Sequence, residues 1–151
     1  MELKRGEIYY IDFPYTFDAK YPNGKKKFVL VLQGGDVFSH CDTVVVLLIT
    51  SDSDSKNFET NVTIEAGLTK LSKESYVVCA QPYTMLKSWF SQDGVWCAGC
   101  LPPGKLDEID ECLYIGLCMG LQNASDDDAD DDEEDDIPGD VENDDISDDE
   151  E

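Results

Sequence analysis

The sequence has little of what histidine-dependent enzymes and membrane proteins need. Its only histidine, His40, follows Gly34-Gly35 in a predicted solvent-facing loop, so general acid–base chemistry by histidine is a weak hypothesis. Its longest purely apolar run is six residues, Val44 to Ile49, which is far too short to cross a bilayer. Met1 to Arg5 lead directly into a strand-like pattern without an apolar signal region. We therefore expect a cytoplasmic protein with no membrane segment.

Metal and redox motifs are also scarce. Cys97 and Cys100 form a single CxxC pair, and only His40 with Cys41 could remotely supply further zinc ligands. A thioredoxin-type pair needs its first Cys at a helix N-terminus, whereas Leu101-Pro102-Pro103 delays the next helix here. We interpret the pair as two thiols on a strand. Because the six cysteines lie mostly in apolar runs, we expect reduced thiols, no metal and no cofactor.

Positive charge is absent from the end of the chain. The net charge is −23, but Asp126 to Glu151 hold 18 acidic residues and no Lys or Arg, which leaves 16 acidic and 11 basic residues before them. This end has only Ile137, Val141 and Ile146 to bury against the entropy of ordering the backbone. We therefore predict one folded domain over residues 1–122 and a disordered acidic tail over residues 123–151.

The first 121 residues predict a mainly β domain with one terminal helix. Runs rich in β-branched and aromatic residues predict strands over residues 7–12, 27–33, 43–50, 60–64, 75–80 and 94–101. Residues 13–26 predict a loop, and Gly67 to Leu71 suits one helical turn. After Pro102, apolar residues at three- and four-residue spacing up to Gly120 predict a helix. Short strands without repeated helices favour a small barrel.

Five short motifs follow one another in a characteristic order: Arg5 to Tyr9, Lys27 to Gln33, Ile49 to Ser51, Ser75 to Thr84, and Leu106 to Asp110. Together they resemble the PemK/MazF family of toxin endoribonucleases of type II toxin–antitoxin systems. The resemblance implies an α+β fold, namely a small SH3-like antiparallel β-barrel with a C-terminal helix. It also implies a homodimer, metal-independent and sequence-selective cleavage of single-stranded RNA through attack by the ribose 2′-hydroxyl, and an acidic antitoxin that blocks the RNA site.

The resemblance also implies two catalytic residues. The family usually has Arg-Pro where this chain has Lys27-Phe28, so Lys27 would supply the positive charge that stabilises the phosphorane, without the bidentate fork of an arginine. Thr50 matches the family's hydroxyl at the end of the third strand, which is suited to donate a hydrogen bond to a phosphate oxygen. The implied RNA-binding residues are Lys25, Lys26, Ser51 and Gln81.

Two departures from the family keep other functions open. Some members have an Arg and an Asp where this chain has Val78 and Ala80, so a carboxylate general base is missing there; Asp12 or Asp18 could replace it only if the loop of residues 13–26 folds over the site. The alternative function is a catalytically decayed member that binds RNA or a partner. A third reading, from composition alone, is a nucleic-acid mimic or a chaperone for basic proteins.

Several features also have plain structural interpretations. Lys25 to Lys27 could be a solvated turn, and Thr50 is an ordinary β-branched strand residue. Tyr114 and Met119, away from the main apolar stripe of the helix, mark either a dimer surface or a partly exposed edge. The acidic tail is either a solubility segment or an autoinhibitory segment that lies over the lysines.

Overall fold

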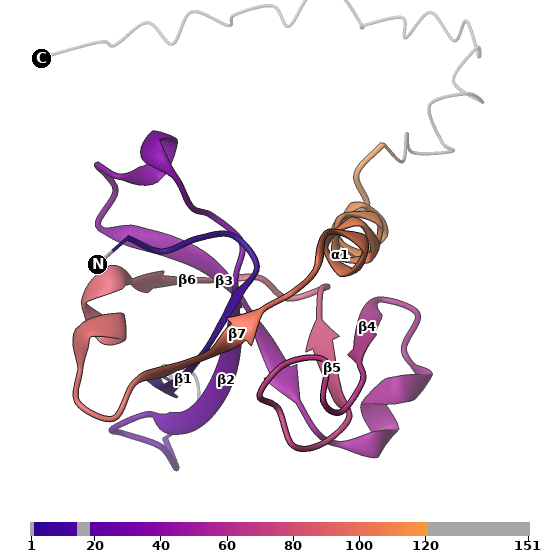
Figure 1. The fold of residues 1–151 in the computed structure, drawn as a ribbon, viewed down its shortest axis with the longest axis horizontal. Coiled ribbons are helices and arrows are strands. Elements are labelled where there is room, and N and C mark those ends of the chain that lie inside the picture. Colours follow the sequence, from indigo (N-terminus) through magenta and orange to yellow (C-terminus); the bar gives the residue numbers. More distant parts are fainter. Residues whose placement is uncertain (1, 15–18, 121–151) are drawn as a thin grey trace, which may run out of the picture. The chain divides into compact units, whose positions relative to one another are not determined.

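The computed structural model describes residues 2–14 and 19–120. Its strands are β1 (Glu7–Phe13), β2 (Lys25–Val31), β3 (Thr43–Thr50), β4 (Asn61–Ile64), β5 (Ser75–Val78), β6 (Tyr83–Leu86) and β7 (Trp96–Cys100). Its helices are the short 3₁₀ segments η1 (Asp36–Phe38), η2 (Ser53–Asn57) and η3 (Lys87–Ser91), and the α-helix α1 (Pro103–Gly116). Figure 1 shows these elements.

The strands of the described ranges form one antiparallel sheet that curls into a half-barrel (Figure 1). The sheet order is β4-β5-β3-β2-β1-β7, and β6 pairs with β3. β3 branches: its first half pairs with β6, and its last two residues, Ile49 and Thr50, pair with β5. The predicted mainly β fold with a C-terminal helix is therefore confirmed.

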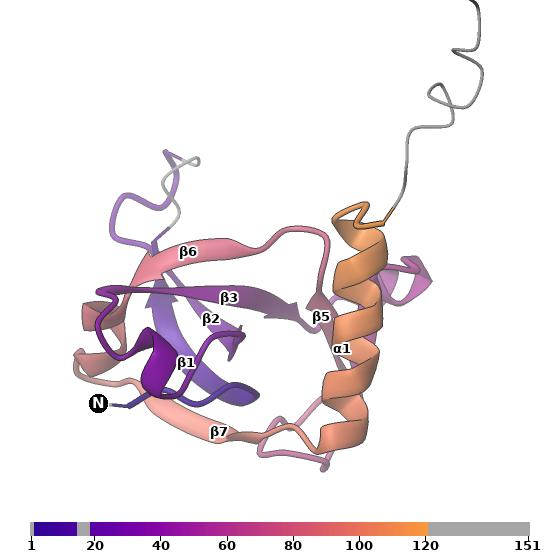
Figure 2. The ribbon, with the colours of Figure 1, turned by 90° about the horizontal axis from the view of Figure 1, so that it is seen from above.

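Both faces of the curled sheet bury apolar side chains, because neighbouring residues of a strand point to opposite faces. One core cluster includes Ile8, Leu30, Leu47 and Ile109 of α1. The other includes Ile11, Val29, Val46 and Phe90 of η3. Figure 2 shows α1 standing at one end of the sheet, next to β5. Arg5 links the helix to the sheet, since its guanidinium donates to the carbonyl of Leu32 at 3.1 Å and pairs with Asp110.

Besides shifts of one or two residues at other strand ends, four assignments from the sequence differ from the structure. β6 was not predicted, and β2 begins at Lys25 because its lysines continue the ladder with β1, with Lys25 opposite Phe13. Gly67 to Leu71 is a turn and not helical, since the backbone N–H of Lys70 donates to the carbonyl of Ala98 on β7 at 2.8 Å. The helix ends at Gly116 instead of near Gly120.

Other expectations agree with the structure or concern residues that it does not describe. His40 is exposed, and Cys97 and Cys100 lie on β7, as predicted. Among the helices of residues 2–14 and 19–120, none is long and apolar enough to cross a membrane. Asp18 and the predicted acidic tail lie outside the described residues.

Candidate functional site

Four of the six residues that the sequence analysis proposed for the site line one cavity of about 340 Å³, here called the site pocket. They are Lys26, Lys27, Thr50 and Ser51. The pocket lies where β2 begins and β3 ends, because the last register pair of these antiparallel strands is Phe28 opposite Ile49. Lys27 and Thr50 are the next residue of each strand. Strand pairing therefore brings together two motifs that are more than twenty residues apart in the sequence.

The lysines of β2 lie on both sides of the strand. Lys25 and Lys27 share one face, and Lys26 shares the other with Phe28. Lys26 Nζ lies 3.1 Å from Asp12 Oδ2, and Lys25 Nζ lies 4.9 Å from the centre of the Tyr21 ring. Lys27 is half-buried, and no carboxylate of the described residues pairs with it. It is therefore the β2 lysine whose charge a bound anion can best compensate.

Burial lowers the pKa of Lys27 below its usual range, and the nearby charge of Lys25 lowers it further. Both causes act against the ammonium form, because burial removes hydration and a neighbouring cation repels it. A phosphate at the pocket would oppose both effects, because a nearby anion favours the ammonium form. The electrostatic environment of Lys27 thus suits an anionic ligand.

Thr50 is held at the end of β3 by a local hydrogen bond. Its Oγ1 accepts from the backbone N–H of Asp52 at 3.2 Å, and the Asp52 carboxylate accepts from the N–H of Asp54 at 3.1 Å. A hydroxyl has one hydrogen and two lone pairs, so accepting from Asp52 leaves the Thr50 hydrogen for donation. Thr50 can therefore donate to a phosphate oxygen while it remains anchored.

The structure adds lining residues that the sequence analysis missed: Tyr10, Phe28, Ile49, Leu71, Ser72, Lys73 and Ser75. Lys73 matters most, because it adds a third cation. It reaches the pocket because buried Leu71 anchors its segment in the core, and because Thr50 pairs with Tyr76 on β5. In the sequence, the only sign of a role for Lys73 was its position just before a predicted strand. The spacing along the chain did not indicate that Lys73 lies near Thr50.

All charged side chains among the described residues that line the site pocket are positive. Three lysines line it, and none of its described lining residues is Asp, Glu or His. Asp12, considered as a replacement base, pairs with Lys26 and does not line the pocket. Lys25 and Gln81 also lie outside the lining, and the Gln81 amide oxygen accepts from the Tyr83 hydroxyl at 3.4 Å. A role for Lys25 or Gln81 in binding RNA remains a prediction.

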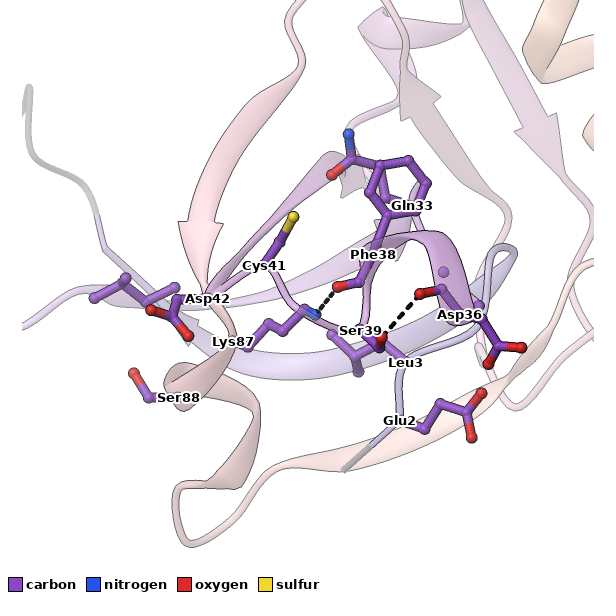
Figure 3. Close-up of a pocket in the computed structure, with 13 residues that line it drawn as sticks. Glu2, Leu3, Gln33, Asp36, Phe38, Ser39, Cys41, Asp42, Lys87 and Ser88 are labelled. Carbon is purple, nitrogen blue, oxygen red and sulfur yellow. Dashed lines mark hydrogen bonds between the residues drawn. The ribbon is translucent and has the colours of Figure 1, made fainter.

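A larger cavity, of about 750 Å³, has the wrong charge for a phosphate site (Figure 3). Three carboxylates line it, those of Glu2, Asp36 and Asp42. Its one lysine, Lys87, donates to the carbonyl oxygen of Phe38 at 2.5 Å. Because the carboxylates would repel an anion, we assign the functional site to the smaller, basic pocket.

Comparison with protein families identifies the chain. Residues 4–117 match the model of the PemK-like, MazF-like toxins of type II toxin–antitoxin systems. This chain belongs to the PemK/MazF toxin family. The family match covers the whole sheet and α1 and stops before the acidic end of the chain. The resemblance inferred from the five motifs is thereby confirmed.

Solved structures share the PemK/MazF fold. An endoribonuclease in complex with its cognate antitoxin, from a mycobacterial species, has 19% sequence identity and a TM-score of 0.60, and the match covers 80% of this chain and 99% of that one. MazF from Deinococcus radiodurans has 18% identity and a TM-score of 0.59, covering 79% and 99%. A MazE–MazF complex from the same organism has 18% identity and a TM-score of 0.58, covering 79% and 98%. At this identity, the similarity establishes the fold.

Proposed function

We propose that this PemK/MazF family member is an endoribonuclease that cleaves single-stranded RNA at selected sequences without a metal ion. The observation that carries the proposal is the convergence of Lys27, Thr50, Ser51 and Lys73 on one basic pocket. In the proposed reaction the ribose 2′-oxygen bonds to the adjacent phosphorus and the bond to the 5′-oxygen breaks. The 2′-hydroxyl loses its proton and the 5′-oxygen gains one, which leaves a 2′,3′-cyclic phosphate and a 5′-hydroxyl.

Lys27 and Thr50 would act on the phosphate during this reaction. Negative charge builds up on the non-bridging oxygens as the phosphorane forms, and a half-buried ammonium stabilises that charge more than a solvated one does. The Thr50 hydroxyl donates to one of the same oxygens from a fixed position. Lys73 and Ser51, both exposed, would hold neighbouring phosphates.

A second candidate function is RNA or partner binding without cleavage. It is favoured by the absence of Asp, Glu and His from the described residues that line the site pocket, since these are the side chains that most often act as a general base. In this case the lysines would bind phosphates, and the chain would leave the RNA intact.

Cleavage of a long single-stranded RNA in excess EDTA separates the two functions. We expect cut ends at a restricted set of sequences, from both the full chain and a chain that ends at Asn123. No cleavage by either protein at any ionic strength would contradict the enzyme and leave the binding function. Abolition of cleavage by EDTA, with recovery on adding a divalent cation, would contradict the metal-independent mechanism.

The proposal includes a homodimer and an antitoxin as partners. Tyr114, Ile115, Leu117 and Met119 expose 45–60% of their surface at the end of α1 and after it. An apolar face of this kind is typical of a protein–protein contact, and we place the second copy there. The molar mass from light scattering should be that of two chains, and a single-chain mass at micromolar concentration would contradict the dimer.

We also propose that the acidic tail competes with RNA for the lysines of β2. A self-repelling segment of about 26 residues can reach several tens of ångströms, and tethering gives it an effective concentration of about millimolar. We expect truncation after Asn123 to tighten binding of single-stranded RNA several-fold at low salt. The difference in affinity between the truncated and the full-length protein should shrink as salt rises, because salt screens the attraction of the lysines to the tail and to the RNA. Binding is compared between the two proteins at each salt concentration. Equal affinities would make the tail a solubility segment only.

A further inference from the structure

Three aromatic side chains from neighbouring strands form one cluster beside the site pocket, in which each ring contacts the other two. Tyr10 on β1 is directly opposite Phe28 on β2 and Trp96 on β7. The ring centroids are 4.8 Å apart for Tyr10 and Phe28, 5.9 Å for Tyr10 and Trp96, and 5.7 Å for Phe28 and Trp96. Residues directly opposite on antiparallel strands point to the same face. We call these three residues the aromatic platform.

The aromatic platform continues a buried face of the sheet into solvent. Tyr10 comes two residues after Ile8 on β1, and Phe28 comes two residues before Leu30 on β2, so each shares a face with a fully buried core residue. The core ends there, because Tyr10 and Phe28 are partly exposed and Trp96 exposes 42% of its surface. The uncovered aromatic surface is available to a ligand.

The surroundings of the aromatic platform point to a nucleic acid as that ligand. Tyr10 and Phe28 line the site pocket together with Lys27 and Thr50, and Lys26 Nζ lies 5.8 Å from the centre of the Tyr10 ring. Aromatic surface beside lysines is how proteins bind single strands, with bases stacked on rings and phosphates held by cations. A base in a duplex already has stacking partners on both sides, so the platform suits an unpaired base.

We propose that the aromatic platform stacks an unpaired base of the RNA strand whose phosphate occupies the site pocket, with Trp96 as the outermost contact. This inference rests on the proposed function, because it takes RNA as the ligand of the pocket. It assigns a binding role to Phe28, which lines the site pocket and contacts both other rings of the platform. Stacking recognises the flat face of a base, so it contributes to affinity for single strands without selecting one base strictly.

Fluorescence of Trp96 tests the stacking directly. Trp89 is the other tryptophan of the chain, and Trp89→Phe in the full-length protein leaves Trp96 as the reporter. The probe is a 2′-O-methyl RNA of about eight nucleotides, within the range that single-strand binding domains cover. It cannot be cleaved, because its 2′-oxygen is blocked. An abasic strand of the same length keeps the phosphates and lacks the bases. We expect the first probe to quench Trp96 and the second to bind without quenching.

Affinity for the same probes, fluorescein-labelled, gives the second measurement. Trp96→Ala should weaken binding of the 2′-O-methyl RNA by about 5- to 150-fold, the range for loss of one stacked base, and leave binding of the abasic strand unchanged. Trp96→Phe should recover most of the loss, because it restores a ring. Phe58→Ala is the matched control, since Phe58 is an aromatic residue with 61% exposure that neither lines the site pocket nor belongs to the aromatic platform, whereas Trp96 contacts the pocket-lining rings of Tyr10 and Phe28. It should bind both probes like the parent.

The outcomes keep this inference separate from the proposed function. Equal quenching by both probes, or equal affinity of Trp96→Ala and parent for the 2′-O-methyl RNA, would overturn base stacking, and the platform would then fit a protein partner better. Stacking without cleavage of ordinary RNA would contradict only the enzyme. If Trp96→Ala does not fold, the quenching of Trp96 in the Trp89→Phe protein by the two probes still decides.

Discussion

Replacing Lys27 by Ala is expected to lower the rate of RNA cleavage by about 10²–10³-fold, the usual cost of removing one group that stabilises charge in a transition state. Lys27 is half-buried, and no carboxylate of the described residues neutralises it, so its charge acts on the phosphate at close to full strength. Lys27→Arg should remain active, because it restores the cation and adds the planar fork that binds two phosphate oxygens.

Single-turnover cleavage with excess enzyme measures the chemical step and is the assay for these variants. Lys70→Ala is a matched control, since Lys70 is exposed and does not line the site pocket. A lower rate for Lys27→Arg than for Lys27→Ala would contradict charge stabilisation and indicate that Lys27 transfers a proton or has a structural role. Equal rates for Lys27→Ala and the parent would remove Lys27 from the site.

The same variants predict a pH dependence. Because burial and Lys25 lower the pKa of Lys27, its ammonium form is lost at a lower pH than that of an exposed lysine. With subsaturating RNA, where the pH dependence reports the pKa of the free enzyme, a reaction that needs the cation is therefore fast below this pKa and declines as the pH rises through it. The decline should disappear in Lys27→Arg, because a guanidinium stays protonated in that range. An alkaline decline that is unchanged in Lys27→Arg would assign it to another group.

Thr50→Ala is expected to lower the cleavage rate by about 10²-fold, because it removes a fixed donor to the phosphorane. Thr50→Ser keeps the hydroxyl and should retain most of the activity. The same single-turnover assay applies, and circular dichroism checks that each variant is folded, since Thr50 also accepts from the Asp52 N–H. A Thr50→Ala variant as active as the parent, or a Thr50→Ser variant as inactive as Thr50→Ala, would contradict hydrogen-bond donation by Thr50.

Local patterns predicted most of the strands. β3 runs from Thr43 to Thr50 as expected, because eight residues rich in β-branched side chains are an unambiguous strand signal. β6 was missed because Tyr83 to Leu86 is short and follows Pro82, so its strand character comes from pairing with β3. The prediction of a helical turn over Gly67 to Leu71 was wrong. The backbone N–H of Lys70 donates to the carbonyl of Ala98, which lies on β7 and is distant in the sequence.

Some residues of the candidate site could be predicted from local sequence, and others could not. Lys27 and Thr50 could be proposed from the sequence because each stands in a short motif of a recognisable family. Lys73, Tyr10 and Phe28 could not, since they line the pocket, and Trp96 contacts the latter two, only through the pairing of strands that are far apart in the chain. The spacing of Tyr10, Phe28 and Trp96 gives no sign that their rings meet.

By itself, the sequence determined the class of fold, the family, the separation of an acidic end from a nearly balanced domain, and the charge available for binding an anion. These follow from composition, from the period-two pattern of strands and from short motifs, all of which act over a few residues. The tertiary structure decided which lysines share a pocket, that no acidic side chain of the described residues lines it, and that Tyr10 and Phe28 line it with Trp96 against them. Such groupings depend on strand register and on the curl of the sheet, which arise from interactions between distant parts of the chain.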